Sequence, residues 1–88
     1  MKHLNIRVYG KVQGVFFRVS AKQEAEKLNL TGFARNEKDG TVYIEAEGEQ
    51  KNLDEFLKWC KNGPDSARVD KIESTPGHLK NFSDFTMS

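Results

Sequence analysis

Features that point to several common function classes are scarce in this sequence. Cys60 is the only cysteine among 88 residues, so neither an internal disulfide nor a four-thiolate zinc site can form, which suits a reducing compartment. No apolar run reaches the length of a signal-peptide core or a membrane span. We therefore expect a cytoplasmic protein that has no membrane partner.

Charge of one sign is also missing. The 14 Lys and Arg residues nearly cancel the 13 Asp and Glu residues, which leaves a formal net charge of +1. A nucleic-acid-binding domain of this size usually carries a clear basic excess. No nucleic-acid partner is expected.

The length of the chain limits its organisation. A chain of 88 residues suits one small core, so we expect a single free-standing domain over residues 1–88. The sequence shows no obvious apolar patch, so a monomer is expected. So small a core leaves little room for an internal cavity. Any active site should therefore be a groove lined by loops.

Hydrophobic periodicity predicts strands and helices in a definite order. Alternation over residues 3–9 predicts a strand, and helical spacing from Phe17 to Leu28 predicts a helix. Two further strands, 31–36 and 41–47, flank an Asp39-Gly40 turn. A second helix follows, then a strand over 67–74 and an apolar tail at 82–87 that could add an edge strand.

The second helix has the clearest end signals. Asn52 is predicted to cap it, with Glu55 completing a capping box, and Gly63-Pro64 should end it. Its predicted core stripe is Leu53, Phe56, Leu57 and Cys60.

The element order is strand, helix, strand, strand, helix, strand. Two helices are too few to cover both faces of a sheet, so the economical packing is an α+β, ferredoxin-like sandwich with both helices on one face of an antiparallel sheet. That fold supports many functions and indicates none of them.

The connection between the first strand and the first helix carries the most unusual sequence, GKVQGVFFR at residues 10–18. Gly10 and Gly14 permit backbone conformations that are closed to other residues. The loop ends where a helix begins, so free amide groups, the helix dipole and the guanidinium of Arg18 can face one anion. A phosphate or a carboxylate fits best. The alternative is a plain connection whose glycines only turn the chain.

Rival motifs are absent. A Walker loop needs Lys followed by Ser or Thr after its last glycine, whereas Val15 and Phe16 follow Gly14 here. The thiol of a cysteine-dependent phosphatase loop would stand at Val12. His3 and His78 show no metal-binding spacing and are expected to be exposed and structural. No metal or other cofactor is expected.

Three motifs together resemble the acylphosphatase family. They are GKVQGVFFR, then LTGFARN, and then GPDSARV after the Asp39-Gly40 turn, and the likeness spans about residues 6–87. The resemblance implies an enzyme, a hydrolase acting on acid anhydrides. Its substrates would be small acyl phosphates, whose carboxyl-phosphate bond it would cleave to a carboxylate and inorganic phosphate without a metal.

The resemblance also implies roles for particular residues. Arg18 would bind the phosphoryl group, and Asn36 would orient the attacking water. Phe33 stands where many relatives have Trp, and Phe16 and Ser20 occupy variable positions, so the resemblance does not fix the acyl-group preference. Substrate-binding backbone amides would come from Val12, Gln13, Gly14, Val15, Phe16 and Phe17.

Two other functions fit the predicted fold. A ferredoxin-like RNA-binding domain should show an aromatic RGFGFV-like run and a basic surface, and TGFARN with a net charge of +1 shows neither. A non-catalytic module that binds small anions would use the same loop without turnover. Only an assay separates this module from an enzyme.

Overall fold

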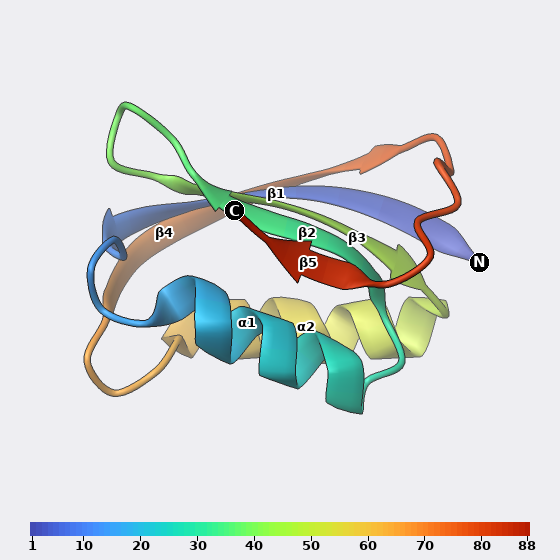
Figure 1. Cartoon of the computed structure of the whole chain (residues 1–88), viewed down its shortest axis with the longest axis horizontal. Coiled ribbons are helices and arrows are strands. Elements are labelled where there is room, and N and C mark those ends of the chain that lie inside the picture. The colour runs from blue at the N-terminus through green and yellow to red at the C-terminus, as the bar shows by residue number, and fades with distance from the viewer.

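All the predicted strands and helices are present in the computed structural model, which describes residues 1–88. The strands form one sheet in the order β4-β1-β3-β2-β5, and both helices cover the same face of it (Figure 1). The predicted ferredoxin-like α+β sandwich is therefore confirmed. The elements are β1 (Lys2–Lys11), α1 (Phe17–Lys27), β2 (Thr31–Asn36), β3 (Val42–Gly48), α2 (Gln50–Asn62), β4 (Arg68–Gly77) and β5 (Phe85–Met87).

The sheet is mixed rather than wholly antiparallel, which corrects the prediction. The apolar tail does add an edge strand, but β5 pairs with β2 in parallel. After β4 ends, the chain crosses to the far edge of the sheet and enters β5 in the direction of β2. Because β1 and β2 are both antiparallel to β3, the carboxyl ends of β1, β2 and β5 all lie at the same end of the sheet.

The core lies between the sheet and the two helices. Alternate residues of the strands, such as Ile6 and Ile44, point toward the helices and are fully buried. Phe17 from α1 and Phe56 from α2 pack against them in a cluster of 16 buried residues. Cys60 belongs to this cluster, and burial raises the pKa of its thiol far above the ordinary value, so the thiol stays protonated and unreactive.

The start of α2 differs from its prediction. The helix begins at Gln50, its N-cap is Glu49, and no side chain caps it. β3 runs to Gly48, so the chain turns into the helix at once, and the carbonyl of Glu49 accepts the first helical hydrogen bond from the Leu53 N–H. Asn52 therefore lies within the first turn and caps nothing. The predicted end holds, with Gly63 as the C-cap.

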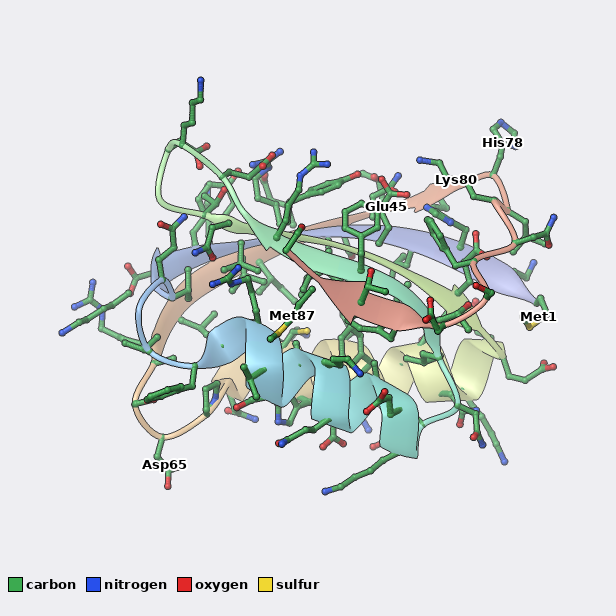
Figure 2. The ribbon with its side chains drawn as sticks, in the orientation of Figure 1. Met1, Glu45, Asp65, His78, Lys80 and Met87 are labelled. Atoms are coloured by element: carbon green, nitrogen blue, oxygen red, sulfur yellow. The ribbon has the colours of Figure 1, made fainter.

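His3 is buried, which contradicts the expectation that both histidines are exposed. It lies on the face of the sheet opposite the helices, yet only 4% of its surface is accessible. Its Nδ1 lies 2.6 Å from Oε2 of Glu47. Residues 78–84 cross over this end of the sheet, where Figure 2 shows Lys80 beside Glu45 and His78 pointing away from the sheet. Sequence periodicity cannot reveal such a cover because it comes from a distant segment.

Glu47 holds that covering segment in place. Its carboxylate accepts hydrogen bonds from the backbone N–H of Lys80 at 2.6 Å and of Phe82 at 3.2 Å. Burial alone would raise the pKa of Glu47, but these hydrogen bonds and His3 outweigh burial and hold the pKa below its ordinary value. The charged carboxylate is therefore the form that stabilises the fold.

We predict that Glu47→Gln lowers the free energy of unfolding by about 3 kcal/mol at pH 7, because the amide loses the negative charge and places an NH2 donor where one carboxylate oxygen accepts hydrogen bonds. The lowered pKa means that Glu47 contributes fully above the ordinary value of 4.5 and loses this contribution as the pH falls through the lowered value. Urea unfolding of both proteins at pH 7 and at pH 3 should therefore show the gap narrowing in acid. A gap of equal size at both pH values would contradict this account.

Candidate active site

The loop between β1 and α1 keeps its backbone amides free. Gly14 and Phe16 both have left-handed backbone conformations, with φ of 73° and 63°. No N–H between Val12 and Phe16 donates to an acceptor within the protein. The first turn of α1 follows directly, and its N–H groups have no helix carbonyl ahead of them. Such a run of unbonded amides is a typical anion-binding arrangement.

Side chains of the loop fix its shape. Val12 and Phe17 are each 1% exposed and belong to the core. The Gln13 side-chain amide donates to the backbone oxygens of Glu37 at 2.7 Å and of Thr41 at 2.9 Å, which ties the loop to the turn between β2 and β3. On its other side, Ser66 donates to the Val15 carbonyl at 2.6 Å. The loop is therefore held from two directions while its amides stay free.

These contacts refine the predicted binding residues. A cavity of about 230 Å³ is lined by Val12, Gly14, Phe16, Phe17, Arg18, Val19 and Asn36. Gln13 and Val15 are not among its lining residues; they lie in the same loop but act as anchors. The anchoring roles of Gln13 and Ser66 had no signal in the sequence, because their partners are distant backbone carbonyls.

Arg18 and Asn36 meet in this cavity although they belong to different elements. Arg18 is in the first turn of α1, and Asn36 is the last residue of β2. They come together because the carboxyl ends of β1 and β2 lie at the same end of the sheet, so the loop after β1 lies beside the end of β2. The two residues that the sequence singled out therefore line the same cavity.

The guanidinium of Arg18 also contacts the end of the chain. Its Nη1 donates to the backbone oxygen of Ser88, and the Ser88 N–H donates to the Ala34 carbonyl at 3.1 Å. Because β5 runs parallel to β2, Ser88 lies at the same end of the sheet as Asn36. This contact between residues far apart in the sequence was not predicted.

Arg18 is the one charged residue that lines the cavity. No Cys, His, Asp, Glu or Lys side chain lines it, so the site offers a cation, free amides and one carboxamide. Such a set can hold a tetrahedral dianion and orient a neutral molecule beside it. It offers no thiolate or imidazole nucleophile, and no group of three or more His, Cys, Asp and Glu residues is arranged to hold a metal ion.

No helix in the structure has the length and apolar character needed to cross a membrane.

Known proteins are similar to this chain in sequence and in fold over almost its whole length. The acylphosphatase family model matches residues 4–87. An acylphosphatase from Methylococcus capsulatus is 45% identical over 83% of this chain and 79% of its own. The crystal structure of acylphosphatase from Bacillus subtilis superposes with a TM-score of 0.97 at 37% identity, covering 100% of this chain and 99% of that one. An acylphosphatase structure from Coxiella burnetii gives 0.96 at 36% identity, covering 99% and 92%.

The match includes the loop and both strand ends that form the cavity. The resemblance seen in the sequence motifs is therefore confirmed by a family model and by solved structures. This chain belongs to the acylphosphatase family.

Proposed function

We propose that this protein hydrolyses small acyl phosphates at the cavity beside the β1–α1 loop, with no metal required. The observation that carries the proposal is that Arg18, Asn36 and the loop that holds the free amides line one cavity. The phosphoryl group would sit against the amides of residues 12–17, where N–H dipoles and the guanidinium face its equatorial oxygens. In phosphoryl transfer, charge gathers on these oxygens, so fixed donors lower the barrier.

The leaving group explains why so few reactive side chains suffice. Cleavage of the carboxyl-phosphate bond releases a carboxylate whose conjugate acid has a pKa of about 4. It departs with the bond's electron pair and needs no proton from the protein. A cavity without His, Asp or Glu is therefore adequate for this substrate class. A phosphate ester, whose alkoxide leaves poorly, would be a poor substrate.

Asn36 would place the nucleophile. Its carboxamide oxygen can accept a hydrogen bond from water but cannot take the proton at neutral pH. The water oxygen forms the new bond to phosphorus opposite the departing carboxylate, and its proton passes to a phosphoryl oxygen of the substrate. The products are a carboxylate and inorganic phosphate. Holding the water in line is the contribution expected of Asn36.

Hydrolysis of benzoyl phosphate tests the activity. We expect turnover well above the buffer rate, and we expect it to persist in excess EDTA because none of the proposed steps uses a metal. No turnover would contradict the proposal and favour an anion-binding module. Turnover that EDTA abolishes and Mg²⁺ restores would contradict the metal-free mechanism alone.

Arg18→Gln should lower kcat/KM for benzoyl phosphate by about 10²- to 10³-fold, the usual effect of losing one donor to developing negative charge. Arg35→Gln is the matched control, because Arg35 is an exposed arginine of β2 that pairs with Glu37 at 3.0 Å and does not line the cavity. Steady-state kinetics of both variants, with circular dichroism to verify folding, make the comparison. Equal activities of the two variants would refute the role of Arg18.

Asn36→Ala should reduce kcat by about 100-fold while KM changes little, because the water loses its orientation but the phosphoryl cradle remains. Asn52→Ala, in the first turn of α2 and outside the cavity, serves as the control. If Asn36→Ala instead raises KM and leaves kcat intact, Asn36 binds substrate rather than water. That result would overturn the assignment.

A further inference from the structure

Phe16 combines an exposed aromatic side chain with a strained backbone conformation. Its side chain is 75% exposed, the largest value among the exposed large hydrophobic residues. Its backbone is left-handed, with φ of 63° and ψ of 21°, a conformation that is unfavourable for a residue with a side chain. Glycine would relieve this strain.

The position of Phe16 in α1 makes its identity more unusual. It is the N-cap of the helix, and no side chain donates or accepts a capping hydrogen bond there. The left-handed backbone also departs from the extended conformation from which Ser, Asp or Asn cap a helix. Stability of the loop would therefore favour glycine, and the phenylalanine adds no cap to the helix. A large exposed ring at this point calls for a role outside the fold.

Val19 lies beside Phe16 on the rim of the cavity. It is the third residue after the N-cap and lies in the first turn of α1. Val19 is 38% exposed, and both residues line the cavity together with Arg18. The other apolar lining residues, Val12 and Phe17, are each only 1% exposed. Phe16 and Val19 thus supply the accessible apolar surface of the site.

The volume of the cavity bears on which part of a substrate it encloses. Its volume of about 230 Å³ is below the range of roughly 300–1,000 Å³ typical of sites that enclose a whole small molecule. A phosphoryl group at the amides and Arg18 fills part of this volume. A bulky acyl group attached to it would extend toward the rim, where Phe16 and Val19 lie.

We propose that Phe16, assisted by Val19, binds the acyl group and selects for aromatic or bulky apolar acyl phosphates. This inference rests on the proposed hydrolysis at the same site. An aromatic acyl group can stack on the Phe16 ring and cover Val19, whereas an acetyl group is too small to bury much of either side chain.

The experiment compares kcat/KM for benzoyl phosphate with kcat/KM for acetyl phosphate in each protein. We expect Phe16→Ala to lower this ratio about tenfold, the usual scale for losing apolar contact in a specificity site, chiefly through KM for benzoyl phosphate. Phe16→Gly removes the ring but also relieves the left-handed strain, so it should lower the ratio as much as Phe16→Ala. Phe16→Leu keeps apolar surface and should give an intermediate ratio.

Leu79→Ala is the matched control, because Leu79 is an exposed apolar residue, 44% accessible, outside the cavity. Its ratio should equal that of the wild type. A wild-type ratio in Phe16→Ala, or an equal loss for both substrates, would overturn the inference while hydrolysis itself stands. A wild-type protein that hydrolyses neither substrate would overturn the proposed function, and this inference with it.

Discussion

The backbone of residues 12–16 has to present its N–H groups outward without internal partners, and the site depends on that constraint. Unbonded amides are costly to bury and useful only where an anion can reach them. The left-handed conformation at Gly14 turns the loop, and a Cβ added there would meet nothing within 4 Å, so this side of the backbone is open. Gln13 and Ser66 then hold the loop to its two neighbours. The rigid sandwich supplies the anchor, and the loop carries the chemistry.

The topology decides what stands beside these amides. Strands β1, β2 and β5 share one direction, so the β1–α1 loop, Asn36 and Ser88 lie at one end of the sheet. Several other charges pair on the open face of the sheet, where Arg35 lies 3.0 Å from Glu37 and His3 lies 2.6 Å from Glu47. Arg18 is therefore the charged side chain that lines the cavity, and no Asp or Glu side chain lines it to repel a phosphoryl dianion. This separation suits hydrolysis with a carboxylate leaving group, which requires placement and charge stabilisation rather than acid catalysis.

Most of the architecture could be predicted because it follows from local patterns. Alternation in β1 and helical spacing in α1 each report one buried face, and the order of the elements then limits the packing. What could not be predicted depends on distant contacts. The burial of His3 comes from a segment more than 70 residues away, and the contact of Arg18 with Ser88 requires β5 to lie parallel to β2. Asn52 was misplaced because the length of β3, rather than a capping side chain, determines where α2 begins.

The central claim is that free loop amides and Arg18 together bind a phosphoryl dianion. The most direct test is to titrate isotopically labelled protein with inorganic phosphate and to follow each backbone amide by NMR. The account predicts saturable shifts concentrated at residues 12–18, together with the Nε–H of Arg18, and much weaker binding in Arg18→Gln. Saturable shifts centred on the open face of the sheet, or no shift of the loop amides at saturating phosphate, would contradict it.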